Sequence, residues 1–305
     1  MLLGAVLLWA LNVTVSKYML EHGWRPLAYG TIRYFAAISL FWIFTYWRER
    51  SFRIARKDLK LVGAAALALF SNQLCFVYSL KLGQASTLSL VFGTTPVFTG
   101  FLALLLRLER LQRSFWIGAA LTVAGVIFVG IGAGSGASAG LAGFILGTGT
   151  ALTWALYTIA IAPLMRTYSP YRISALVLAL GWIPLALVSI PQVAEQHFTF
   201  GWRVWLGFGY AVIGPLFLTN ILWFTAVAIV GASRATLFNN LQPFFGVFFA
   251  LLILSESLHL AEIVGGVLIF AGIALERVRR RPIPEVVARR GDAPQADAGE
   301  VIGPE

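Results

Sequence analysis

The sequence predicts an all-α integral membrane protein of ten transmembrane helices, built as two five-helix repeats of inverted topology. Three observations lead to this fold class: hydrophobicity along the whole chain, a series of apolar runs of membrane-spanning length, and an internal repeat. Of the 305 residues, 59% are hydrophobic and 12% are charged, whereas a soluble domain has about 25% charged residues. Lipid is therefore the expected solvent for most of the surface.

The apolar runs are each long enough to cross a hydrocarbon layer roughly 30 Å thick. The first run begins at residue 2 without a basic start or an obvious small-residue cleavage site, so we interpret it as a span rather than a signal peptide. The charged, Pro/Gly/Ala-rich segment 280–305 is predicted to be a disordered tail. The expected spans are residues 2–20, 27–47, 59–80, 86–106, 114–132, 140–162, 171–191, 203–229, 234–254 and 261–279.

The basic residues predict the orientation of these spans. With the N-terminus in the cytoplasm, 18 of the 23 Lys and Arg residues fall in inside loops or the tail, and only three fall outside. This bias predicts a multi-pass protein of the cell inner (plasma) membrane with both termini cytoplasmic. The net charge of +10 is explained by these loops, so no nucleic-acid partner is expected.

An internal repeat becomes visible when the chain is shifted by 147 residues. Because each half holds an odd number of spans, the halves must insert with opposite orientation, which suits alternating access. The loop around residues 107–110 is basic, whereas its mate at 255–257 has no Lys or Arg, as inversion requires. We expect repeats over residues 1–132 and 140–279. The matched residues are Pro96 with Pro243, Glu109 with Glu256, Gly118 with Gly265, and Gly125 with Gly272.

Two blocks around these residues resemble a known family. The segments PVFTGFLALLLRLERLQRSFWIGAALTVAGVIFVG and PFFGVFFALLILSESLHLAEIVGGVLIFAGIAL resemble the two EamA domains of the drug/metabolite transporter superfamily. Arg33, within TIRYFAA, is similar to an arginine common in the family's second span, although the second half has no basic counterpart. The resemblance covers about residues 1–279. It implies ten helices, a central cavity between the halves and transport of small metabolites, often export.

Polar and aromatic side chains inside the predicted spans are the candidates for lining such a cavity. Amides are costly against lipid and are expected to face inward, although hydrogen bonds between helices, worth about 0.6 kcal/mol each, are the alternative explanation. Tryptophans near span ends also fit the membrane-interface belt. The cavity candidates are Trp9, Asn12, Asn72, Gln73, Tyr78, Trp154, Tyr157, Asn220, Asn239, Asn240 and Gln242.

A second group of residues carries structural or gating hypotheses. Pro96 and Pro243 lie near the middle of their spans, where a proline removes a backbone hydrogen bond and makes either a hinge or a packing kink. Lys17 and Arg33 either reach the outer surface or bind an anionic group. Glu109 and Glu256 are expected to have structural roles at helix ends. Close helix packing is expected at Gly118, Gly125, Gly265 and Gly272.

These features favour a secondary transporter of small organic metabolites. An aromatic and amide-rich lining without acid suits a neutral or zwitterionic solute, such as an amino acid with an apolar or aromatic side chain. Multidrug carriage stays open, and nucleotide-sugar carriage would require more inward basic groups to meet its phosphates. Since no carboxylate lies deep in a predicted span, coupling through a membrane glutamate is not expected. The protein is expected to be a monomer, with a homodimer as the alternative.

Other function classes are disfavoured by what the sequence lacks. A single cysteine, Cys75, excludes an intramolecular disulfide, and the three histidines have no metal-ligand spacing. There is no phosphate-binding GxxxxGKS/T loop, so ATP is not expected to drive the protein. No acid pair, His pair or reactive Cys occurs within the spans, so we expect neither an intramembrane enzyme nor a bound metal or cofactor.

Overall fold

The computed structural model describes residues 1–107, 113–134, 138–219, 221–223, 226, 238 and 241–278. Throughout these residues the regular structure is helical. Within the described residues, seven helices are long and apolar enough to cross a membrane, and one pair of bent helices makes an eighth candidate. Two shorter apolar helices follow, so the predicted all-α class holds, whereas the count of ten spans stays a prediction.

The helices follow the predicted apolar runs closely. In the first half they are α1 (Leu2–Glu21), α2 (Pro26–Glu49), α3 (Leu59–Leu82), α4 (Ala85–Phe92), α5 (Thr95–Leu105) and α6 (Arg113–Gly134), with a 3-10 turn, η1 (Arg56–Asp58), before α3. In the second half they are α7 (Ser138–Ile161), α8 (Pro170–Ala194), α9 (Trp202–Val212), the π-helical η3 (Ile213–Leu218), α12 (Leu241–Leu254) and α13 (Leu260–Val278), with the 3-10 turn η2 (Leu164–Arg166) before α8.

Helix boundaries are set by local sequence signals. Pro26 and Pro170 occupy the first turns of α2 and α8, where proline's missing N–H costs no helical hydrogen bond. The side chain of Ser169 caps α8 by accepting from the Arg172 N–H at 3.2 Å. Gly23, with φ 99°, turns the chain between α1 and α2, a left-handed conformation that glycine adopts without strain.

The expected single span over 86–106 is divided into two helices. α4 and α5 meet at a 40° bend, and Pro96 is the second residue of α5. Proline cannot donate the hydrogen bond that would continue α4 through this point. Pro243 is the third residue of α12 and is buried. Pro96 therefore lies in the first turn of α5, and the role of both prolines as hinges stays a prediction.

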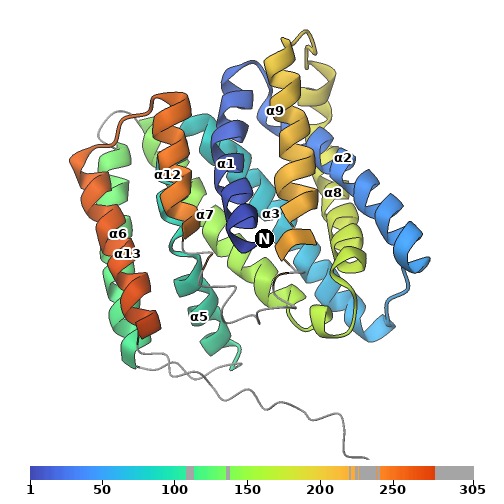
Figure 1. The fold of residues 1–305 in the computed structure, drawn as a ribbon, viewed down its shortest axis with the longest axis horizontal. Helices are drawn as coiled ribbons and strands as arrows, with labels where there is room; N and C mark the ends of the chain where they lie inside the picture. The colour runs from blue at the N-terminus through green and yellow to red at the C-terminus, as the bar shows by residue number, and fades with distance from the viewer. Residues whose placement is uncertain are drawn as a thin grey trace, which may run out of the picture.

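The bundle extends from the α6–α13 pair at one side to the α2–α8 pair at the other, with α1, α3 and α7 between them (Figure 1). The α6–α13 contact depends on glycine. A Cβ at Gly265 would lie 2.5 Å from the Gly125 carbonyl oxygen, and a Cβ at Gly272 would lie 2.5 Å from the Gly118 carbonyl oxygen. The four glycines singled out in the sequence thus meet in two pairs, where backbone touches backbone.

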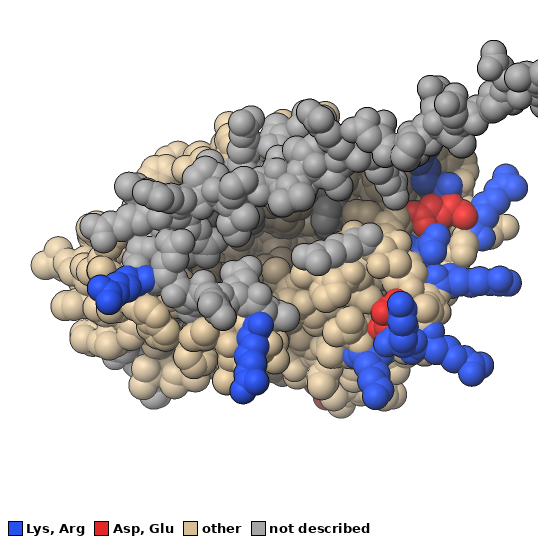
Figure 2. All heavy atoms as spheres, turned by 90° about the horizontal axis from the view of Figure 1, so that it is seen from below, with Lys and Arg blue, Asp and Glu red and all other residues tan. Residues whose placement is uncertain are grey.

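Charged side chains gather on part of the surface, and large apolar side chains are widely exposed. Seen from below, Lys and Arg gather toward one side of the molecule, accompanied by a few acids (Figure 2). Arg172 pairs with Glu49 at 2.8 Å and links α8 to α2. Large apolar side chains are also exposed, as with Trp47 at 74% and Leu252 at 67%. Exposed apolar surface of this extent is typical of a membrane-facing protein.

Candidate functional site

A buried arginine is the centre of a polar cluster between α1, α2 and α3. Arg33 is only 2% exposed, so its guanidinium does not reach the surface as one sequence hypothesis allowed. Nη1 donates to Asn12 Oδ1 at 3.2 Å and Ser16 Oγ at 3.3 Å. It also lies 3.4 Å from the Tyr29 hydroxyl, and Nη2 donates to Gln73 Oε1 at 3.1 Å. We call Asn12, Ser16, Tyr29, Arg33 and Gln73 the Arg33 cluster.

Aromatic rings enclose the guanidinium on several sides. The Arg33 Cζ atom lies 4.9 Å from the Tyr29 ring centroid, 5.5 Å from that of Phe76 and 5.6 Å from that of Tyr34. Such cation–π contacts contribute about 0.5–2 kcal/mol each. They favour the charged guanidinium inside the bundle, but they do not neutralise its charge.

The Arg33 cluster has unused hydrogen-bonding capacity. Within the described chain, Arg33 Nε and Gln73 Nε2 are buried and have no hydrogen-bond partner. The ion pairs of the described residues do not include Arg33. Isolated buried charges are normally paired, and Arg binds a carboxylate through two parallel N–H donors. The cluster therefore has the chemistry to accept a carboxylate or a similar anion.

Two other cavity candidates, Asn72 and Tyr78, form hydrogen bonds between helices. Asn72 Nδ2 donates to the Thr150 carbonyl at 2.8 Å and to Thr153 Oγ1 at 3.2 Å, which joins α3 to α7. The Tyr78 hydroxyl accepts from Gln192 Nε2 at 2.9 Å. These bonds match the alternative reading of amides as links between helices.

The aromatic candidates pack in pairs. Trp9 lies 5.4 Å from Trp223, and Trp154 lies 5.2 Å from Tyr157, between ring centroids.

Gln242, the remaining described candidate, is half-buried in α12. Four further candidates fall outside the described residues, namely Asn220, Asn239, Asn240 and Glu109.

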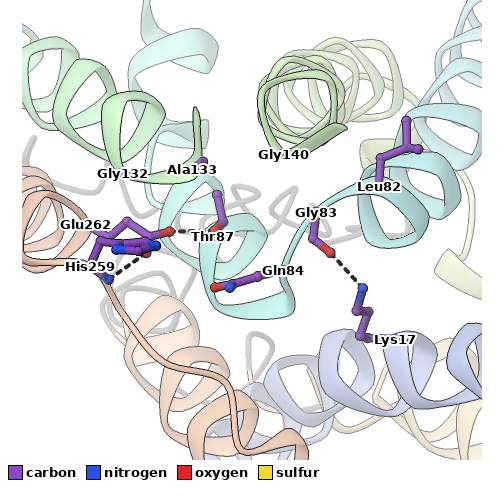
Figure 3. A pocket seen from close by; sticks show the side chains of 10 residues that line it. All are labelled: Lys17, Leu82, Gly83, Gln84, Thr87, Gly132, Ala133, Gly140, His259 and Glu262. Carbon is purple, nitrogen blue, oxygen red and sulfur yellow. Dashed lines mark hydrogen bonds between the residues drawn. The ribbon is translucent and has the colours of Figure 1, made fainter. Parts of the chain in front are cut away.

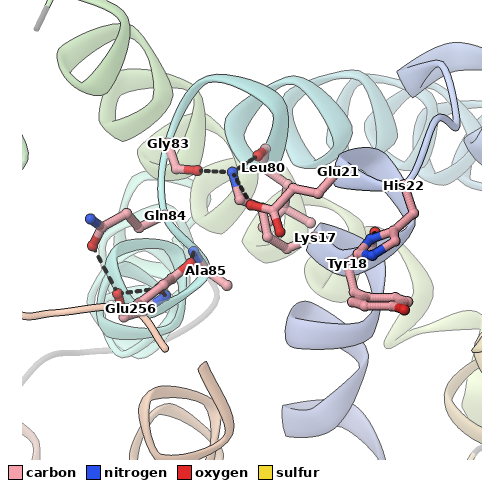
Figure 4. Close-up of polar contacts among 10 residues, drawn as sticks. Lys17, Tyr18, Glu21, His22, Leu80, Gly83, Gln84, Ala85 and Glu256 are labelled. Carbon is pink, nitrogen blue, oxygen red and sulfur yellow. Dashed lines mark hydrogen bonds and ion pairs between the residues drawn. The ribbon is translucent and has the colours of Figure 1, made fainter. Parts of the chain in front are cut away.

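A second group of charged contacts lies where α3 turns into α4. Lys17 Nζ donates to the Leu80 carbonyl at 2.9 Å and the Gly83 carbonyl at 2.8 Å, and it pairs with Glu21 at 3.4 Å (Figure 4). Lys17 thereby links the C-terminal end of α1 to the C-terminal end of α3. Its three ammonium donors face two carbonyls and one carboxylate, and its role as an anion contact stays a prediction.

Glu256 holds the same turn from the other half of the chain. Its Oε1 accepts from the Ala85 N–H at 2.8 Å, and its Oε2 accepts from the Ser86 N–H at 2.8 Å and the Ser86 hydroxyl at 2.6 Å (Figure 4). The carboxylate thus satisfies first-turn donors of α4, where helix dipole and negative charge attract. The contact joins two segments about 170 residues apart in sequence.

A pocket of about 320 Å³ lies beside this turn. Glu262, in the first turn of α13, is 1% exposed and reaches the pocket from one side, whereas Lys17 lies on the opposite side (Figure 3). Its Oε1 accepts from Thr87 Oγ1 at 2.6 Å, and its Oε2 accepts from the His259 N–H at 3.0 Å. Gln84 and the glycines Gly83, Gly132 and Gly140 also line the pocket.

Glu262 was missed by sequence reasoning because acids at the start of a helix are common. Its position near a span end gave no indication of burial. Ser16 and Tyr29 were missed as well, although a signal was present. Each lies four residues from a polar candidate, Ser16 from Asn12 and Tyr29 from Arg33, and residues four apart share a helix face.

Apolar helices with exposed hydrophobic faces, enclosing buried polar clusters, are typical of a multi-pass membrane protein. The chain belongs to the EamA-like transporter family, whose model matches it twice, over residues 1–131 and 141–276. The resemblance to this family seen in the sequence is thereby confirmed. Membership and the names of relatives indicate a transporter rather than an enzyme.

Similar proteins cover nearly the whole chain. A probable amino-acid metabolite efflux pump of Salmonella typhimurium is 27% identical over 90% of this chain and 94% of its own. The uncharacterized transporter YetK of Bacillus subtilis is 25% identical over 88% of this chain and 83% of its own. One crystal structure superimposes with a TM-score of 0.62 at 18% identity, covering 90% of this chain and 94% of that chain, which concerns the fold alone.

Proposed function

We propose that this protein is a secondary transporter that moves small carboxylate-bearing metabolites, neutral or aromatic amino acids among them, across the cytoplasmic membrane by alternating access. The observation that carries this proposal is the buried guanidinium of Arg33, which has neutral partners and an unused Nε–H, in a chain of transporter family. The named activity of the Salmonella relative, amino-acid metabolite efflux, agrees with this substrate class and favours export.

The chemistry of Arg33 favours a carboxylate over other ligands. Taking an unpaired cation out of water costs several kcal/mol, and the neutral acceptors and rings around Arg33 offset only part of this cost. A substrate carboxylate would supply the missing negative charge and engage Nε and Nη2 side by side. Gln73 Nε2 would then find an acceptor as well.

The proposed transport cycle depends on the repeat architecture. Ten spans in two inverted halves would expose the Arg33 cluster alternately to the two sides of the membrane. The basic loops favour cytoplasmic termini, which places the α3–α4 turn at the outer end. Pro96 and Pro243 are the proposed flexible points of this motion.

The proposal is tested by counterflow in proteoliposomes loaded with amino acids, the corresponding carboxylic acids, amines and nucleotide sugars. We expect exchange of amino acids and aromatic carboxylates. Arg33→Lys, which keeps the charge but cannot bind a carboxylate through two N–H donors, should reduce exchange at least about tenfold. Arg203→Gln, which removes an exposed arginine, is the matched control and should exchange normally. Correctly folded protein that exchanges no compound of the panel would refute transport.

A further inference from the structure

Glu262 is a buried carboxylate whose negative charge is not balanced by the described chain. The ion pairs there join Lys17 with Glu21, Arg25 with Glu195, and Arg172 with Glu49, and none of them includes Glu262. A hydroxyl and a backbone N–H satisfy part of its hydrogen-bonding capacity. An ionised carboxylate has about four lone-pair sites, so acceptor capacity remains on a side chain that lines the pocket.

Helix capping accounts for only part of this arrangement. A glutamate in the third helical position often reaches back to the N–H of the capping residue, and Glu262 makes this bond to His259. The bond to Thr87 comes from a different helix, α4, and the cap does not require it. Nor does a cap require burial, because capping carboxylates function at exposed helix ends.

The repeat also shows that the fold does not need an acid at this position. In the 147-residue register, Glu262 corresponds to Phe115, which is 4% exposed. The equivalent position of the first half is therefore filled by an apolar ring. Gly132 admits the glutamate, because a Cβ there would lie 2.5 Å from Glu262 Cγ. An acid at a site where the repeat tolerates phenylalanine points to a role beyond packing.

Lys17 does not supply the missing cation. It faces the pocket from the opposite side (Figure 3), but its ammonium group is engaged by Glu21 and by two carbonyls. The Lys17–Glu21 pair has no net charge. The carboxylate of Glu262 therefore gives the pocket an excess of negative charge. A ligand that enters beside Glu262 should therefore be cationic where it meets the carboxylate.

We infer that this pocket binds the ammonium group of a small organic solute, with Glu262 as the anionic contact and Thr87 holding its carboxylate in place. A volume of about 320 Å³ is at the small end of ligand pockets and suits a single metabolite. The inference rests on the proposed function in taking this solute to be the transported one. It adds a preference for amino acids over carboxylates that have no ammonium group, and it gives the transporter an ammonium site separate from the Arg33 cluster.

Binding to purified protein tests this site without transport. The probe is 2-phenylethylamine, and 2-phenylethanol is its uncharged counterpart; thermal stabilisation is measured against concentration. We expect the amine alone to stabilise the protein. Glu262→Gln, which keeps the cap and the shape but loses the charge, should weaken amine binding about tenfold or more. Glu262→Asp, which keeps the charge, should retain part of the amine binding. Glu195→Gln changes an exposed acid and should leave amine binding unchanged.

The outcomes separate this inference from the proposed function. Equal amine binding in the wild type and in Glu262→Gln overturns the ammonium site, whatever counterflow shows. Stabilisation by Na⁺ that depends on Glu262, without any by the amine, also overturns it and assigns the pocket to an inorganic cation. Amine binding that depends on Glu262 in protein that exchanges no solute supports the site and refutes the transport proposal.

Discussion

Replacing Gly265 by alanine probes the contact between α6 and α13 at its tightest point. The added Cβ would lie 2.5 Å from the Gly125 carbonyl oxygen, 2.7 Å from Val129 Cγ2 and 2.8 Å from the Val129 backbone nitrogen. Two of these atoms belong to the backbone of α6, so rotation of a side chain cannot relieve the clash. The helices would have to separate, and overpacking of this kind costs about 1–3 kcal/mol.

The matched control is Gly63→Ala in α3. No atom lies within 4 Å of a Cβ built at Gly63, so this change only replaces glycine by a better helix former. Replacing glycine by alanine at a compatible helical site stabilises by about 0.4–1 kcal/mol. The two substitutions are chemically identical, and the structure predicts opposite signs for them.

Thermal unfolding of the protein in mild detergent measures both changes. Gly265→Ala should lower the midpoint, and Gly63→Ala should leave it unchanged or raise it slightly. A Gly265→Ala midpoint equal to or above that of the wild type would refute the close backbone contact. Equal losses in both variants would show that glycine at either site acts through the unfolded chain or the detergent, not through α6–α13 packing.

Two further predictions concern the α3–α4 turn and the Arg33 cluster. Glu256→Ala removes the acceptor for the first N–H groups of α4 and should destabilise the protein by about 0.5–2 kcal/mol; Glu256→Gln, which keeps one acceptor oxygen, should recover part of this in the same unfolding assay, and a neutral effect of alanine would contradict the cap. Gly30→Ala would place a Cβ 2.7 Å from Gln73 Nε2 and should displace the amide group that accepts from Arg33. The rate of counterflow should therefore fall, whereas the unfolding midpoint should stay close to that of the wild type. Unchanged exchange would show that this amide is not needed for transport.

Much of the fold was predictable because lipid requires long apolar runs. Each helix in the structure overlaps a predicted span, and the glycines chosen for packing lie in the α6–α13 contact. The bend between α4 and α5 was foreseeable from Pro96, since proline interrupts the helical hydrogen bonds. The apolar run over residues 86–106 did not indicate whether one helix or two would form there.

The candidate sites were less predictable because their partners come from distant segments. Asn12, Arg33 and Gln73 were each recognised as polar residues in apolar spans, but their convergence depends on how α1, α2 and α3 pack. Glu262 looks like an ordinary first-turn acid in the sequence. It becomes a buried charge only because α4 and α6 pack over the start of α13, and a single sequence does not encode that packing in any local pattern.

The contact between α6 and α13 joins the last helix of one half to the last helix of the other through nearly bare backbone. Each helix therefore presents a strip of glycine backbone to its counterpart, and the side chains of Val129, Ile269 and Ile273 pack beside it. A polypeptide carrying only one half would leave such a strip open to lipid. Two copies of that polypeptide could close these strips against each other, as α6 and α13 do within this chain.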